Sequence, residues 1–86
     1  MYNADLSGAN LSYLNLTNTS FDSADLSNVN FTYADLTNAD LAIANLTNAN
    51  LEYADLTNAM LVYADFTGAI VTVSYTHLTL PTIYSV

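Results

Sequence analysis

The sequence predicts an all-β fold in which the chain winds into a coil, and three observations lead to this prediction. A large apolar residue returns at every fifth position, a small residue precedes it by two positions, and Asp, Asn, Ser and Thr fill much of the remainder. A period of five does not suit an α-helix, because five residues turn a helix through about 500° and spread the apolar positions around it. It does not suit a flat strand either, because an odd period sends alternate apolar residues to opposite faces. Each five-residue unit must therefore contain a corner.

Two sets of positions form the predicted interior of the coil. The large set is Leu6, Leu11, Leu16, Phe21, Leu26, Phe31, Leu36, Leu41, Leu46, Leu51, Leu56, Leu61, Phe66 and Val71. The small set, two positions earlier in each unit, is mostly Ala, and on a short extended piece residues two apart point to the same side. Leu14 and Val29 occupy the small position, so we expect a local bulge or a packing adjustment there.

The fifth residue of each unit indicates how many units make one turn of the coil. Gly and Asn return every ten residues, whereas Tyr13, Tyr33 and Tyr53 return every twenty. With stacked coils about 4.8 Å apart, these tyrosines form a ladder on one face. Gly and Asn are expected at corners because both tolerate a positive φ. The side chains of Asn10, Asn30 and Asn50 share a face and predict an amide ladder that stabilises the stack.

The unit A-[DN]-L-[ST]-x resembles the pentapeptide repeat, whose consensus is A-[DN]-L-x-x, over residues of about 4–73. The resemblance implies a right-handed quadrilateral parallel β-helix with about four repeats per coil and about three and a half coils in this chain. We therefore divide the chain into a truncated pentapeptide-repeat β-helix at 1–72 and a tail at 73–86 that lacks the repeat.

The tail has a separate interpretation. Its run VSYTHLTLPT resembles an in-frame translation of the transposase mosaic-end adapter used to build sequencing libraries, so we expect the tail to be adapter-derived. On this interpretation His77 and Pro81 carry no function, and the native protein continues beyond about Thr72. An array cut in this way exposes Leu61, Phe66 and Val71, and the open ends of the solenoid predict self-association.

Composition excludes several classes of function. The chain has no Lys or Arg, eight acidic residues and a formal charge of −8, which makes direct binding to nucleic acid or to anionic lipid unfavourable. It has no Cys, and its single His lies in the tail, so the repeats offer neither a nucleophile-base pair nor a cofactor or metal site. We expect no enzymatic activity. The sequence shows no signal peptide and no apolar run long enough to span a membrane, which leaves the compartment unknown, with the cytoplasm as the default.

The remaining hypothesis is a noncatalytic scaffold that binds a protein or has a structural role, in which the stacked tyrosines would stiffen the solenoid. Tyr13, Tyr33 and Tyr53, extended by Tyr63 on the neighbouring face, form a candidate aromatic docking strip. Two acidic rows complete the candidate surface, and their members are Asp5, Asp25 and Asp65 on one face and Asp35 and Asp55 on the opposite face. The partner is unknown. The alternative is charge mimicry, because some pentapeptide-repeat proteins resemble duplex DNA in size and charge and protect type II topoisomerases by occupying the DNA site.

Overall fold

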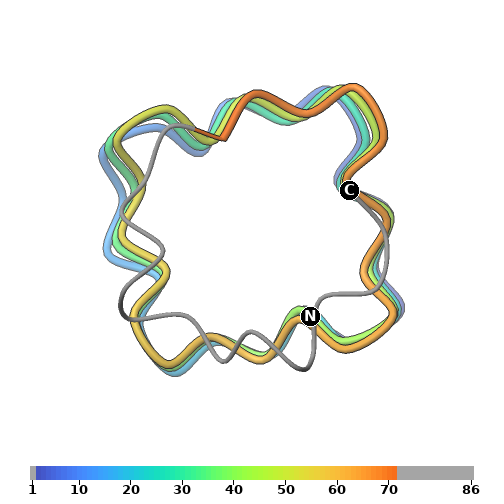
Figure 1. Cartoon of the computed structure of the whole chain (residues 1–86), viewed down its shortest axis with the longest axis horizontal. Helices are drawn as coiled ribbons and strands as arrows, with labels where there is room; N and C mark the ends of the chain where they lie inside the picture. The colour runs from blue at the N-terminus through green and yellow to red at the C-terminus, as the bar shows by residue number, and fades with distance from the viewer. Residues whose placement is uncertain (1, 72–86) are drawn as a thin grey trace.

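The computed structural model describes residues 2–71, and over this range the chain winds into a stack of four-sided coils. Figure 1 looks along the stack: successive coils lie almost in register, and the chain turns counterclockwise as it advances toward the viewer, which is the right-handed sense. Each five-residue unit forms about one side of the square. The tail at 73–86 lies outside the described residues, so its adapter origin stays a prediction.

The coils pair through isolated parallel bridges, each of which joins two residues twenty positions apart. Within residues 2–71 there is no helix and no continuous strand, and one residue in five forms a bridge, from Asp5 with Asp25 to Asn50 with Ile70. The amide of Leu46 donates to the carbonyl of Asp65 at 2.8 Å, and the amide of Asp65 donates back to Ala44 at 3.0 Å. The predicted twenty-residue register is therefore confirmed.

Every unit ends in a turn whose fifth residue has a positive φ. This holds at all fourteen positions from Asn3 to Gly68, and the amide that follows commonly donates to the large apolar residue three positions earlier, as Ala39 does to Leu36 at 3.0 Å. A positive φ at the third residue of a turn is the feature that favours Gly and Asn in type II turns. The expected Gly and Asn are nevertheless not the only residues at the corners, because Tyr13 and Ile43 also lie there, with φ values of 64° and 62°.

In most units an Asp or Asn fixes the turn from outside the coil. Asp25 Oδ1 accepts hydrogen bonds from the amide and the hydroxyl of Ser27 at 3.1 and 2.7 Å, and Asn30 Oδ1 accepts the same pair from Thr32 at 3.0 and 2.8 Å. Such side-chain bonds to the backbone two residues on are typical of Asx turns, and they explain why the unit reads [DN]-L-[ST]. The asparagine amides do stack by register, but their oxygens serve these turns instead of a ladder between coils.

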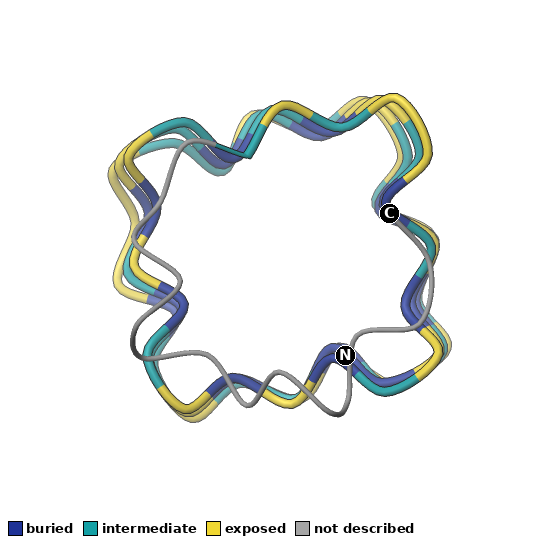
Figure 2. Ribbon diagram, viewed as in Figure 1, coloured by how far each residue is buried: buried dark blue, intermediate teal, exposed yellow. Residues whose placement is uncertain are grey.

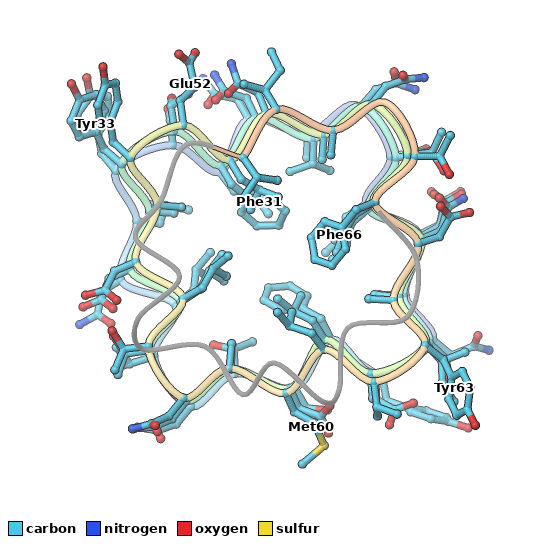
Figure 3. All side chains as sticks on the ribbon, in the orientation of Figure 1. Phe31, Tyr33, Glu52, Met60, Tyr63 and Phe66 are labelled. Carbon is cyan, nitrogen blue, oxygen red and sulfur yellow. The ribbon has the colours of Figure 1, made fainter. Side chains whose placement is uncertain are left out.

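The core is the inside of the tube. Figure 2 shows buried residues along the inner edge of each side and exposed residues at the outer corners, and in Figure 3 Phe31 and Phe66 point inward. Leu36, Leu46 and Phe31 are completely buried, and burial of a side chain of this size contributes about 1.5–3 kcal/mol. Phe21 and Phe31 meet edge to face, with ring centroids 6.2 Å apart.

The two bulky residues at the small position behave differently from each other. Val29 is 1 % exposed, and the hydrogen bonds that link its coil to the two neighbouring coils keep lengths of 3.0 and 2.9 Å, so there is no bulge between coils. The amide of Val29 lies 3.3 Å from the carbonyl of Leu26, against 2.9–3.1 Å in units with Ala, which is a small packing adjustment of the turn. Leu14 instead lies in the first coil and is 45 % exposed, while its carbonyl keeps a 2.9 Å bond to the amide of Asp35. The tube therefore accommodates one extra branched residue in its interior without a change of register.

The apolar residues of the last described coil are more buried than the sequence predicts. Leu61 and Phe66 are 1 % and 6 % exposed, so the prediction that they are open to solvent is wrong for this chain. Val71 is partly buried and packs against the core. At the first coil, Leu6 and Leu11 are likewise only partly buried.

Candidate partner-binding surface

The three predicted tyrosines form a ladder along one corner of the coil. The rings of Tyr13 and Tyr33 stack with centroids 5.1 Å apart and an interplanar angle of 7°, and those of Tyr33 and Tyr53 stack at 4.9 Å and 20°. All three remain open to solvent, with exposed fractions of 74, 52 and 62 % in chain order. Figure 3 shows these rings projecting outward at the corner labelled Tyr33. We call this set the tyrosine ladder.

The ladder is held in an unfavourable backbone conformation. Tyr13, Tyr33 and Tyr53 have φ values of 64°, 60° and 60°, a region that costs an L-residue with a bulky side chain about 1–2 kcal/mol. Asn, which occupies the equivalent turn position in Asn38 and Asn48, tolerates this region better. Each stacked ring pair contributes about 0.5–1.5 kcal/mol, so stacking offsets part of the strain.

Tyr63 does not extend the ladder. Figure 3 places Tyr63 at the corner diagonally opposite Tyr33, so the expectation that it lies on the neighbouring face is wrong. Register explains the difference, because Tyr63 follows Tyr53 by ten residues, which is half of the twenty-residue turn.

The acidic rows lie where the register predicts, but only one of them adjoins the ladder. Asp5 bridges Asp25, and Asn45 separates this pair from Asp65 along the same row. Asp35 bridges Asp55 half a turn away, on the opposite side of the coil. These two residues follow Tyr33 and Tyr53 by two positions, just past the ladder corner. The structure therefore joins Asp35 and Asp55 to the ladder and separates the row that contains Asp5 from it.

Glu52 is a member of this surface that sequence reasoning missed. It immediately precedes Tyr53, and Figure 3 shows it on the side of the coil that leads to the tyrosine corner. Most units have Ser or Thr at this position, so the replacement by Glu was the available signal. Glu52, Asp35 and Asp55 thus border the ladder on its two sides, and we call them the acidic border.

Hydrogen bonds within the turns stabilise the ionised carboxylates. Asp35 Oδ1 accepts from the amide and the hydroxyl of Thr37 at 3.1 and 2.6 Å. At Asp5, the backbone amide of Ser7 at 3.1 Å and then its hydroxyl at 2.8 Å lower the pKa of the carboxyl from its ordinary value of 3.8. Hydrogen bonds to the charged form favour ionisation, which is why the pKa of Asp5 is lowered.

The tyrosine ladder and the acidic border contain side chains of the kinds that bind other proteins. Neighbouring rings cover both faces of Tyr33, so a partner meets ring edges and hydroxyls, which contact apolar and hydrogen-bonding groups. Carboxylates beside the rings accept hydrogen bonds from Lys or Arg. Among residues 2–71, no three acidic or histidine side chains gather closely enough to hold a metal ion. Over the same range no helix is long and apolar enough to cross a membrane.

Comparison with known proteins agrees with the repeat and the coil. The family model for pentapeptide repeats matches residues 4–42 and 44–72 in eight copies, so this chain belongs to the pentapeptide repeat family. No curated protein sequence matches the chain. The matched solved structures are themselves pentapeptide repeat proteins, and this family forms right-handed quadrilateral β-helices.

Three solved structures illustrate the likeness. A pentapeptide repeat protein from the thylakoid lumen of Arabidopsis thaliana is 36 % identical with a TM-score of 0.77, and the match covers 78 % of this chain and 46 % of that one. HetL from Nostoc sp. strain PCC 7120, which is involved in the regulation of heterocyst differentiation, is 36 % identical with a TM-score of 0.63 and coverages of 77 and 35 %. Rfr23 from Cyanothece 51142 is 36 % identical with a TM-score of 0.51 and coverages of 81 and 51 %. The match therefore spans about half or less of the length of these proteins.

Proposed function

We propose that this chain is a noncatalytic scaffold that binds a protein partner through the tyrosine ladder. The observation that supports the proposal most strongly is the stack of three exposed rings, 5.1 and 4.9 Å apart, held at turn positions where Tyr is strained. A rigid stack loses little conformational entropy on binding, which favours its use as an anchor. The expected architecture is the right-handed quadrilateral β-helix with about three and a half coils.

The acidic border indicates that the partner surface is positively charged. Arg forms paired hydrogen bonds with carboxylates and can lay its apolar stem against the ring edges, whereas an acidic partner would be repelled by Glu52, Asp35 and Asp55. The expected partner surface is therefore a stretch that presents Arg between apolar side chains. The row of Asp5, Asp25 and Asp65 lies apart from this surface, so we assign it at most a general electrostatic contribution.

Charge mimicry of DNA is less consistent with the placement of the acids. Asp5, Asp35, Asp40 and Glu52 fall in four different units of the twenty-residue turn, and hence on four sides of the coil. A mimic of duplex DNA would need its charges along one path. Inhibition of DNA supercoiling by gyrase tests this alternative, and it requires Asp→Asn variants to lose the effect in a salt-sensitive way.

A binding experiment with two matched variants tests the scaffold proposal. The protein captured by the wild-type chain in its source cells is identified, purified and titrated against wild type, Tyr33→Asn and Asn38→Ala. Both substitutions fall at turn positions with φ near 60°. We expect Tyr33→Asn to weaken binding by about tenfold or more, the loss of one anchor of about 1.4 kcal/mol or more, and Asn38→Ala to leave binding unchanged. Equal affinity of all three proteins contradicts the proposal.

Self-association through the solenoid ends is a separate part of the proposal. Leu14 is 45 % exposed and Leu6 and Leu11 are only partly buried at the first coil, which leaves apolar surface there for a second copy. Because the chain carries a charge of −8, the association is expected to strengthen as salt screens the repulsion. Sedimentation velocity at rising protein concentration and at two salt concentrations tests it, and a monomer throughout contradicts it.

A further inference from the structure

One unit of the array lacks the outward polar residues that define the repeat. In unit 59–63 the three outward positions are Met60, Val62 and Tyr63, where unit 44–48 has Asn45, Thr47 and Asn48. Met60 and Tyr63 are 50 and 67 % exposed, and Figure 3 shows both projecting from the coil. The turn of unit 59–63 lacks the Asx hydrogen bonds of other units, because methionine has no oxygen to accept them.

The adjacent coil continues the same apolar surface. The amide of Leu41 donates to the carbonyl of Met60 at 2.8 Å, and that of Ile43 donates to Val62 at 2.9 Å, so unit 39–43 lies directly against unit 59–63. Its corner residue Ile43 is 57 % exposed, whereas Ala42 beside it is buried. Scattered apolar side chains on a surface are ordinary, but a contiguous group marks an interaction site. We call Ile43, Met60, Val62 and Tyr63 the apolar patch.

A carboxylate that can accept a further hydrogen bond adjoins the apolar patch. Asp40 forms a bridge with Met60, and its Oδ1 accepts the amide of Ala42 at 3.0 Å. In units such as 24–28 the second bond to Oδ1 comes from the hydroxyl of Ser27, but Ala42 has no hydroxyl to donate. Asp40 therefore combines a negative charge, an open acceptor and an apolar neighbour.

We propose that the apolar patch and Asp40 form a second docking surface, distinct from the tyrosine ladder, for a protein segment that presents apolar side chains next to Lys or Arg. Charge complementarity selects this occupant. Asp22 and Asp40 lie on the same side of the coil as the patch, and the chain has no basic residue of its own. A second copy would bring acid against acid, and an anionic lipid surface would be repelled in the same way.

Nuclear magnetic resonance with three synthetic peptides tests the proposal on the full chain. The first peptide alternates Leu and Arg, the second alternates Ser and Arg, and the third alternates Leu and Glu. The reporters are the methyl groups of Met60, Ile43 and Val62, and the tyrosine rings of the ladder report on the other surface. We expect the Leu and Arg peptide to shift the three methyl signals, and the other two peptides to shift them far less at equal concentration.

Two variants make the test specific. Met60→Asn, Val62→Thr and Tyr63→Asn, made together, restore the pattern of unit 44–48, so the fold is retained while the apolar surface is removed. We expect this variant to bind the Leu and Arg peptide about tenfold more weakly or worse. Asp40→Asn keeps an oxygen for the Ala42 amide and removes only the charge, so it is expected to weaken binding and to reduce its salt dependence.

The outcomes that overturn the proposal are distinct. Equal methyl shifts from the Ser and Arg peptide would show general counterion attraction, and equal shifts from the Leu and Glu peptide would remove the role of Asp40. Shifts confined to the ladder rings would show that the patch does not bind. Methyl shifts that depend on protein concentration without any peptide would identify a second copy as the occupant.

Discussion

The amide of Leu46 lies 2.8 Å from the carbonyl oxygen of Asp65 on the next coil, while the side chain of Leu46 is completely buried in the tube. One residue thus links neighbouring coils through its backbone and fills their shared core through its side chain. Because the large residues from Leu16 to Leu51 repeat this double role at every fifth position, the stability of the array depends on these inward positions.

Replacement of an inward leucine by aspartate is therefore expected to abolish cooperative unfolding. Leu36→Asp or Leu46→Asp would place an unpaired charge inside the tube at a cost of several kcal/mol, which is comparable to the whole stability of a small domain. Thermal unfolding followed by circular dichroism measures the loss. Asn38→Ala, at an exposed turn, is the control and is expected to cost about 1–2 kcal/mol because alanine disfavours its φ of 60°. Similar losses at the inward and outward positions would refute the inward assignment.

The middle ring of the tyrosine ladder is expected to contribute more stability than the first. Tyr33 stacks on two rings and Tyr13 on one, so Tyr33→Asn removes one more contact than Tyr13→Asn. Both substitutions relieve similar backbone strain, because the φ values are 60° and 64°. Chemical denaturation is expected to show Tyr33→Asn less stable than Tyr13→Asn by about 0.5–1.5 kcal/mol. If the two variants unfold at the same denaturant concentration, the rings do not stabilise one another in solution.

The hydroxyl of Ser7 is expected to lower the pKa of Asp5. The backbone amide of Ser7 is the larger cause of the lowered pKa and the Ser7 hydroxyl the second, so Ser7→Ala removes part of the effect and moves the pKa back toward 3.8. A depressed pKa in the folded state means that this carboxylate stabilises the fold above pH 3.8, and that the contribution is lost as the pH falls through the lower folded value. Carboxyl carbon chemical shifts in a pH titration measure both pKa values. An unchanged pKa in the variant would show that the hydroxyl bond is absent in solution.

The twenty-residue register can be predicted because residues with a spacing of twenty are visible in the sequence. Tyr13, Tyr33 and Tyr53 differ from the Gly and Asn of neighbouring units, and the parallel bridges join residues at that same separation. The inward and outward positions follow equally well, since a residue such as Leu36 differs sharply in polarity from Asp35 beside it. Because the same unit recurs in tandem, its backbone conformation is specified many times, and little of it depends on contacts between distant parts of the chain.

The finer features depend on space inside and around the tube, which the pattern does not encode. Val29 fits at a small position without a change of register, and Tyr13 adopts a positive φ that propensity alone assigns to Gly or Asn. The twenty-residue period does give the position of Tyr63, because ten residues after Tyr53 lead to the opposite corner, and the expectation of a neighbouring face did not apply it. Glu52 and Met60 were missed because each breaks the repeat only once.

Site-specific photocrosslinking around one coil tests the central claim, that partner binding is confined to particular corners of the scaffold. A photoreactive phenylalanine analogue replaces in turn Tyr33, Asn38, Ile43 and Asn48, which have φ values of 60°, 60°, 62° and 61° and one of which lies at each corner. We predict crosslinks to a protein partner from positions 33 and 43 in the source cells, and none from 38 and 48. Equal crosslinking from all four corners, or crosslinks only from 38 and 48, would contradict it.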